Sequence, residues 1–266
     1  MSEIRIKTPE IFNLELSLSC GQAFRWEKDE NTSVFCGVAF GKELKIEEKD
    51  GELIFYETSE EDFQNIWKPY FDLDTDYKKI VTSYTEENLT KAVNAFSGIR
   101  ILRQEPWEAL CSFIISQNNN IPRIKGIVSR LCENFGEKTG GGYTFPSAEV
   151  ISNCTVEDLA PLRSGFRAKY IIDAAKKVSD GTVDFARIDR EPIEFGRENL
   201  MQIKGVGAKV AECTLLYGFH KLEAFPVDVW VKRIMAEMYP EGLPECVKGT
   251  EGIAQQYLFH YRRNME

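Results

Sequence analysis

The residues best suited to chemistry are a lysine, a cysteine and an aspartate in the last third of the chain. Lys209 and Cys213 are spaced to share one face of a helix expected over 208–219. Asp228 follows in the first turn of the next expected helix, 226–238. An amine can attack a carbon and form a Schiff base, and a carboxylate can stabilise positive charge beside it, so both side chains could converge on one sugar. Taken singly, each has a plainer interpretation: a solvated lysine, a carboxylate complementing a helix dipole, and a core cysteine.

A glycine-containing turn lies directly before the lysine. The segment LMQIKGVGAKVAECTLLYGF (200–219) predicts a helix ending at Ile203, a tight turn over Lys204–Gly207 and a new helix from Ala208. The two glycines are expected to adopt positive φ and to leave the N–H groups of the new helix free to bind phosphate. An ordinary helical hairpin with a glycine turn is the alternative on this motif alone.

The elements that must position these residues are of two kinds. Short alternating runs at 34–40, 43–48 and 52–58, parted by GK and KDG turn signals, predict an antiparallel sheet. Helical patterns begin near Ser59 and dominate from about Ile99. Pro106 and Pro226 stand where proline suits a first helical turn. The fold class expected is α+β, with a sheet domain over 1–98 and an all-helical domain over 99–266. The main helices are expected at 106–116, 121–135, 167–179, 194–203, 208–219, 226–238 and 250–261.

Charge is unevenly distributed over the 266 residues. The net charge of −9 lies entirely in residues 1–99, while residues 100–266 carry 22 acidic and 22 basic side chains. The neutral part therefore permits a local basic face that binds DNA, although a neutral helical domain is as often no DNA binder. The seven cysteines show no C-x-x-C spacing, so no disulfide framework, zinc site or iron–sulfur site is indicated. With no secretory signal and no long apolar run, we expect a soluble intracellular protein, either in the cytoplasm and nucleoid or in the nucleus.

Several segments together resemble one family. GVGAKVAEC (205–213) and PVDV (226–229) are similar to the hairpin, lysine and aspartate of the helix-hairpin-helix (HhH-GPD) DNA glycosylases. Within them the chain resembles the 8-oxoguanine DNA glycosylases of the animal and fungal type. The further matches, in chain order, are SCGQAFRW (19–26), the stretch 98–132 with its Asn-Asn-Asn loop, YTFPSAEV to LAPLRSGFRAKY (143–170) and GIAQQYLFHY (252–261).

The resemblance implies a base excision repair enzyme with both DNA glycosylase and AP lyase activity. Such an enzyme flips 8-oxoguanine out of duplex DNA, preferably opposite cytosine, and excises it through a lysine Schiff base. It implies that Lys209 is the nucleophile and that Asp228 stabilises the charge developing on the sugar. For the flipped base it implies recognition by the Gly21 carbonyl, a pairing-edge contact from Gln255 and a sandwich between Phe259 and Cys213.

The resemblance also assigns contacts to the DNA. Asn118 fills the vacated space, Arg123 and Arg167 donate to the widowed cytosine, and Phe166 wedges beside it. Phosphate binding falls to the hairpin, with Lys204, Gly205, Val206 and Gly207. Two positions depart from the family pattern. Trp230 stands where a phosphate-contacting histidine is common, and Phe166 where tyrosine is common.

The missing motifs narrow the choice within the superfamily. Relatives with an iron–sulfur cluster end in four cysteines, whereas only Cys246 follows Asp228 here. Alkyl-base glycosylases lack the lysine at the position of Lys209. The remaining alternatives are a glycosylase for another lesion, such as an alkylated purine or a formamidopyrimidine, and a non-catalytic DNA-binding module, which would have no use for Lys209 or Asp228. We expect a monomer that acts on double-stranded DNA without a membrane partner and without a cofactor, save for a monovalent cation that hairpin carbonyls could hold.

Overall fold

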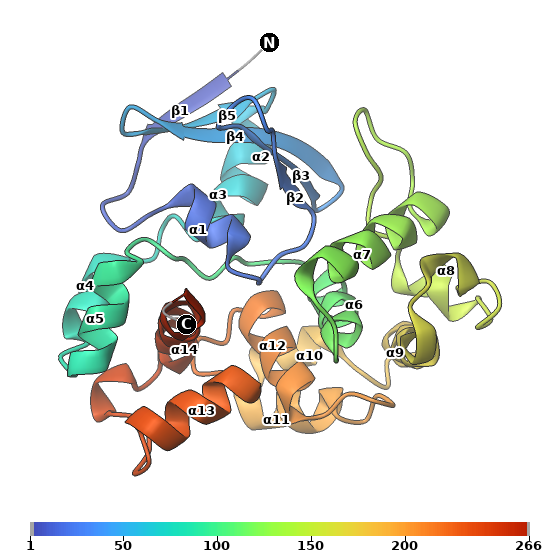
Figure 1. The fold of residues 1–266 in the computed structure, drawn as a ribbon. Coiled ribbons are helices and arrows are strands. Elements are labelled where there is room, and N and C mark those ends of the chain that lie inside the picture. Colours follow the sequence, from blue (N-terminus) through green and yellow to red (C-terminus); the bar gives the residue numbers. More distant parts are fainter. Residues whose placement is uncertain (1–2, 265–266) are drawn as a thin grey trace.

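The N-terminal part of the chain forms a five-stranded antiparallel sheet in the computed structural model, which describes residues 3–264 (Figure 1). The strand order is β1-β5-β4-β3-β2. The Phe40–Gly41 and Asp50–Gly51 pairs, both at positive φ, make the tight turns on either side of β4 that the GK and KDG signals predicted. The strands are β1 (Glu3–Lys7), β2 (Trp26–Lys28), β3 (Phe35–Ala39), β4 (Lys42–Lys49) and β5 (Glu52–Tyr56).

The sequence predicted the three central strands and missed the two at the edges. β2 has only three residues and is too short to show a pattern. β1 (EIRIK) does alternate, but it precedes the first turn signal and pairs with β5 across the intervening hairpins. Long-range pairing of this kind leaves no mark in a local window of sequence.

An aromatic core lies under the sheet. Trp26, Phe55, Trp67, Tyr70 and Phe71 are buried together, and the Trp26 indole N–H donates to the Tyr70 hydroxyl over 2.7 Å. The short helices that cover this face follow β5 directly: α2 (Glu60–Asp62), a π-helical turn (Phe63–Trp67) and α3 (Lys68–Tyr70). A second cluster of buried residues fills the helical part. An N-terminal sheet followed by a largely helical domain confirms the predicted α+β class.

Helices joined by loops dominate the rest of the described chain, below the sheet in Figure 1. The helices predicted over 106–116 and 121–135 agree with α6 and α7. Pro106 fixes the start of α6, and the Asn120 cap fixes the start of α7. The helices are α1 (Leu14–Ser19), α4 (Tyr77–Ser83), α5 (Glu87–Ala95), α6 (Pro106–Ser116), α7 (Ile121–Phe135), α8 (Ala148–Ser152), α9 (Ala168–Ser179), α10 (Phe185–Arg190), α11 (Ile193–Leu200), α12 (Ala208–Gly218), α13 (Val229–Met238) and α14 (Glu251–Asn264).

Three predicted helix ends are wrong by three residues. The last helix, expected over 250–261, continues to Asn264. The helix before the hairpin ends at Leu200 and not at Ile203, because Met201–Ile203 continue as turns. The helix expected from Pro226 starts at Val229. Asp228 has extended φ and ψ and caps that helix, so Pro226 lies in the preceding loop and not in a first helical turn.

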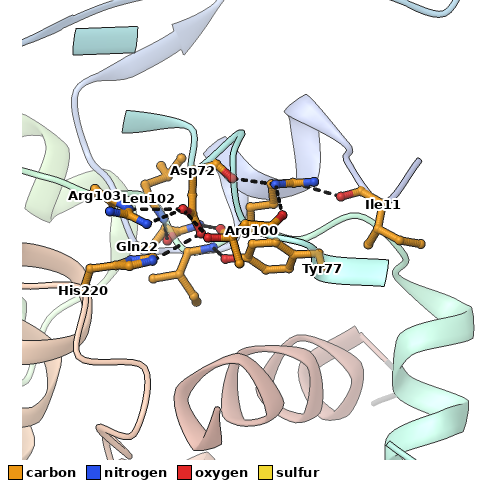
Figure 2. A network of polar contacts seen from close by, with 10 residues as sticks. Ile11, Gln22, Asp72, Tyr77, Arg100, Leu102, Arg103 and His220 are labelled. Atoms are coloured by element: carbon orange, nitrogen blue, oxygen red, sulfur yellow. Dashed lines mark hydrogen bonds and ion pairs between the residues drawn. The ribbon is translucent and has the colours of Figure 1, made fainter. Parts of the chain in front are cut away.

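A buried polar network joins the two parts of the molecule (Figure 2). Asp72, from the loop between α3 and α4, accepts hydrogen bonds from Arg103 over 2.7 and 3.1 Å. Its second oxygen lies 3.2 Å from the Nε2 atom of His220, which follows α12. Arg100 donates to the carbonyls of Asp72 and Ile11. The connection at 100–103 is thus held from both sides.

In the part of the chain that the structure describes, no helix is long and apolar enough to cross a membrane.

Candidate active site

A small cavity of 60 Å³ brings six predicted residues together. Its lining comes from the segment after α1 and from α6, α12, α14 and the loop before α13. A larger cavity of 690 Å³ lies between the sheet and α7 and contains no predicted site residue. The predicted residues of the small cavity are Gly21, Lys209, Cys213, Asp228, Gln255 and Phe259, and its other lining residues are Cys20, Phe113, Tyr217, Pro226 and Gln256.

Lys209 is half-buried in the first turn of α12. Its Nζ atom donates to the Ser116 hydroxyl over 3.3 Å and lies 5.2 Å from the centre of the Phe113 ring. Ser116 in turn donates to the Phe113 carbonyl. The amine is therefore held at the end of α6 by a hydroxyl and an aromatic face. Sequence reasoning missed Ser116, whose only signal was its place just before the Asn-Asn-Asn loop.

Cys213 lies one turn further along α12 and is buried. Burial raises the pKa of its thiol, while the nearby Lys209 ammonium and its hydrogen bond lower that pKa. Lys209 and Cys213 both line the cavity, so the two side chains share one face of α12. An uncharged thiol offers a polarisable apolar wall suited to stacking.

Asp228 enters the cavity from the N-terminal end of α13. Its Oδ1 atom accepts the Val231 N–H over 2.8 Å. A cap of this kind fixes the carboxylate at the positive end of the helix dipole. The cap thus orients the group that was expected within the first turn.

Glu212 anchors the loop that carries Asp228. It is 9% exposed, accepts the Phe225 N–H over 2.7 Å and pairs with Arg197 of α11 at 2.5 Å. One carboxylate therefore ties α11, α12 and the 225–228 segment together. Sequence reasoning missed Glu212, whose signal was a charge inside an otherwise apolar helix.

The two residues expected to read the base, Gly21 and Gln255, line the cavity from the segment after α1 and from α14. Gly21 has φ of +91°, a conformation that favours glycine. Gln255 is buried, and its Oε1 atom has no hydrogen-bond partner among the described residues. A buried unpaired amide oxygen in a cavity is suited to accept from a ligand.

The hairpin before α12 has one strained glycine. Gly205 has φ of +81°, and a Cβ atom there would overlap the Tyr170 ring. Gly207 caps α12 at φ −104°, so the expected positive φ is wrong for Gly207. No hydrogen bond within the described chain uses the N–H groups of Gly207, Ala208 or Lys209. Such groups at a helix N-terminus suit a phosphate.

The other hairpin residues differ in exposure. Val206 is buried, whereas the Lys204 side chain is exposed. The Lys204 N–H donates to Asp173 of α9 over 2.7 Å. The turn is therefore fastened to α9 on one side and open on the other.

The four residues expected to contact the vacated space and the opposite cytosine differ in exposure and in hydrogen bonding. Asn118 stands exposed at the loop tip with φ of +47°, and Phe166 is 46% exposed. Arg123 is exposed, whereas Arg167 is 2% exposed. The Arg167 guanidinium donates to the carbonyls of Gln117, Asn118 and Ser164 and lies over the Phe166 ring. In this conformation Arg167 supports the loop, and of the two arginines only Arg123 has a guanidinium without a hydrogen-bond partner among the described residues.

Trp230 stands at the second position of α13, where the family commonly has histidine. Its ring is half-buried and lies beneath the Arg233 guanidinium at 5.3 Å. The indole cannot carry the positive charge of a protonated histidine, and the charged group that lies against the Trp230 ring is the Arg233 guanidinium.

The fold and the cavity define a class. A sheet domain precedes a helical domain in which a glycine hairpin leads into the helix that carries a lysine, with a capping aspartate on the next helix. Two family models match the chain: the N-terminal domain of 8-oxoguanine DNA glycosylase over residues 4–110, and the HhH-GPD superfamily of base excision DNA repair proteins over residues 111–243.

Individual relatives agree with these models. The N-glycosylase/DNA lyase of Saccharomyces cerevisiae is 37% identical over 84% of this chain and 67% of its own length. A probable N-glycosylase/DNA lyase of Methanothermobacter thermautotrophicus is 35% identical over 73% of this chain and 72% of its own. The Clostridium acetobutylicum 8-oxoguanine glycosylase/lyase, solved with duplex DNA containing cytosine opposite 8-oxoguanine, superposes with a TM-score of 0.92 at 35% identity, covering 99% and 96% of the two chains.

The chain therefore belongs to the 8-oxoguanine DNA glycosylases of the HhH-GPD superfamily. It is a bifunctional N-glycosylase/DNA lyase of base excision repair.

Proposed function

We propose that the protein flips 8-oxoguanine out of duplex DNA and excises it through the amine of Lys209, preferably when the opposite base is cytosine. The observation that carries this proposal is the shared cavity, where Lys209 and the capped Asp228 meet residues suited to bind a base. We also propose the division into a sheet domain, 1–98, and a glycosylase domain, 99–266.

Lys209 and Asp228 are sufficient for the proposed reaction. The neutral Lys209 amine attacks the C1′ atom of the lesion nucleotide, and the bond to the base breaks with its electron pair leaving on the base, which takes up a proton. The sugar ring opens to a Schiff base with Lys209. Loss of a C2′ proton then expels the 3′ phosphate by β-elimination. Asp228 stabilises the positive charge that develops on the sugar.

Selection of 8-oxoguanine over guanine uses the hydrogen that only the oxidised base carries at N7. Oxidation gives guanine an N–H at position 7, where guanine has only an acceptor. The Gly21 carbonyl would accept from this N–H, and guanine would leave the carbonyl buried and unpaired, at a cost of about 1–3 kcal/mol. Gln255 would read the pairing edge, while Phe259 and Cys213 sandwich the ring.

Preference for cytosine follows from the wedge. Cytosine presents acceptors, and a guanidinium supplies donors at any physiological pH. The exposed Arg123 side chain would donate to the cytosine, while Asn118 would fill the gap and Phe166 would separate the neighbouring bases. Phosphates would bind at the hairpin, near Lys204 and the open amides of Gly207, Ala208 and Lys209.

The test uses borohydride, which reduces a Schiff base to a stable adduct. Duplex with 8-oxoguanine opposite cytosine should yield a covalent complex with the wild-type protein. Lys209→Gln should bind the duplex and form no adduct, because only the nucleophile is removed. An undiminished adduct with Lys209→Gln would disprove the assignment of Lys209. A wild-type protein that traps duplex with an abasic site but not 8-oxoguanine would disprove the lesion assignment.

A further inference from the structure

The carbonyl of Gly21 belongs to a peptide with pinned neighbours on both sides. On the C-terminal side, the Gln104 amide donates to the Gln22 carbonyl over 2.7 Å. The Gln22 side chain donates to the Arg100 carbonyl over 2.7 Å and accepts the Leu102 N–H over 2.9 Å (Figure 2). Gln22 is fully buried. The chain after Gly21 is therefore fixed to the connection at 100–104.

On the N-terminal side, two residues of the cavity wall fix the chain before Gly21. The Gln256 amide of α14 donates to the Cys20 carbonyl over 3.2 Å. The Oε1 atom of Gln256 accepts the Tyr217 hydroxyl over 2.6 Å. Both side chains are buried, so each bond is shielded from water. Tyr217 thereby fixes which end of the Gln256 amide faces Cys20.

These two anchors set the direction of the carbonyl between them. A peptide unit is planar, so fixing the Cys20 carbonyl fixes the plane of the Cys20–Gly21 peptide. Glycine at φ of +91° has more accessible conformations than any other residue, and its carbonyl would otherwise rotate freely. With both neighbouring peptides held, the Cα atoms of Gly21 and Gln22 are fixed, and the range of directions open to the Gly21 carbonyl is narrowed.

The N-terminal anchor also lies on the same helix as the proposed nucleophile. Tyr217 lies on α12, the helix of Lys209, and its own carbonyl accepts the Gln104 N–H over 2.8 Å. Its ring stacks on Phe113 at 5.1 Å with an angle of 18°, and Lys209 lies over the Phe113 ring. A shift of Tyr217 would therefore move the lesion-reading carbonyl relative to the amine.

We propose that Tyr217 and Gln256 are positioning residues that determine lesion specificity by holding the Cys20–Gly21 peptide. The inference rests on the proposed reading of 8-oxoguanine by the Gly21 carbonyl. Neither side chain is proposed to touch reacting atoms. Their loss should therefore affect excision of the oxidised base more than cleavage at a site that has no base to read.

The experiment compares two duplexes, one with 8-oxoguanine and one with a preformed abasic site, each opposite cytosine. Tyr217→Phe keeps the ring stack and removes only the hydroxyl, and Gln256→Met keeps the volume and removes both bonds. Single-turnover rates of base excision and of strand cleavage are measured for each. One buried hydrogen bond corresponds to about a tenfold change, so the ratio of excision to abasic cleavage should fall about tenfold in both variants.

The matched control is Tyr84→Phe, which removes a buried tyrosine hydroxyl that bonds Thr250 at the start of α14, outside the cavity. It should keep the wild-type ratio. An unchanged ratio in Gln256→Met, or an equal loss on both duplexes, would overturn the proposal. Absence of 8-oxoguanine excision by the wild-type protein would instead defeat the proposed function on which it rests.

Discussion

Lys209 and Glu212 lie close together on α12, yet only the first could be predicted from the sequence. The lysine belongs to a compact motif with the hairpin and the later aspartate. The role of Glu212 depends on a bond to Phe225 and a pair with Arg197, both set by tertiary packing. Tyr217 and Gln256 were missed for the same reason, since a polar residue within a helix resembles a surface residue until its partners are known.

Glu212→Ala should destabilise the protein by about 2–3 kcal/mol, because the Phe225 N–H and the Arg197 guanidinium lose their buried acceptor. The loop carrying Asp228 should also loosen, slowing borohydride trapping. Urea unfolding and trapping rates measure both effects. Glu194→Ala is the control, because Glu194 is exposed and meets Arg197 only at 3.4 Å, so it should cost under about 0.5 kcal/mol. Equal losses in the two variants would contradict the anchoring role of Glu212.

At the scale of elements, prediction succeeded where local signals fix a helix end. Pro106 and the Asn120 cap gave α6 and α7 their starts. It failed at the hairpin glycines, because K-G-V-G does not reveal which glycine is strained. The close approach of α9 decides this, since the Tyr170 ring lies against Gly205 and open space surrounds Gly207.

Gly205→Ala should therefore cost about 2–3 kcal/mol, combining a positive φ with overlap on Tyr170. Gly207→Ala should cost less than about 1 kcal/mol, because its φ suits any residue and its surroundings are empty. Urea denaturation of both variants checks the contrast. Adding Tyr170→Ala to Gly205→Ala should restore the steric part only. If Gly207→Ala proves the more damaging, the assignment of strain to Gly205 is wrong.

Substitution of Arg167 and substitution of Arg123 should also have different effects, the first on stability and the second on the preference for cytosine. Arg167→Met strips donors from the carbonyls of Gln117, Asn118 and Ser164, so stability should fall by about 2 kcal/mol and excision should fall opposite every base. Arg123→Ala should leave stability within about 0.5 kcal/mol and reduce the preference for cytosine by about tenfold. Unfolding curves and excision rates against four opposite bases test this. A specific loss of cytosine preference in Arg167→Met would show that its guanidinium turns to the base on binding.

For the whole molecule, the class of fold was predictable and the joint between its parts was not. Alternating strands followed by helical patterns indicate α+β from local periodicity. The joint depends on Asp72, on the 100–103 segment with its two arginines, and on His220. These three parts lie far apart in the chain and meet only in the folded state (Figure 2). None of these residues carries a local motif.

This joint should make the free energy of unfolding fall at low pH. Burial raises the pKa of Asp72, but His220, whose Nε2 atom lies 3.2 Å away, acts together with Thr75 and Arg103 to lower the pKa of Asp72 to about 2. A carboxylate with a lowered pKa stabilises the folded state above its unfolded pKa of about 3.9. That contribution, roughly 2 kcal/mol, is lost as pH falls from about 4 through 2.

Asp72→Asn should accordingly be less stable than wild type at neutral pH, and the difference should shrink by roughly 2 kcal/mol between pH 5 and pH 2. Urea unfolding across a pH series measures the free energy of unfolding of both proteins. Subtracting the variant's value from that of the wild type cancels the contribution of the other carboxylates, which both proteins share. Asp74→Asn is the matched control, because Asp74 is 71% exposed and its pair with Lys68 is open to water. Its difference from wild type should stay flat and below about 0.5 kcal/mol. A pH-independent deficit in Asp72→Asn would mean that packing at the joint, and not the ionised carboxylate, holds the sheet to the helices.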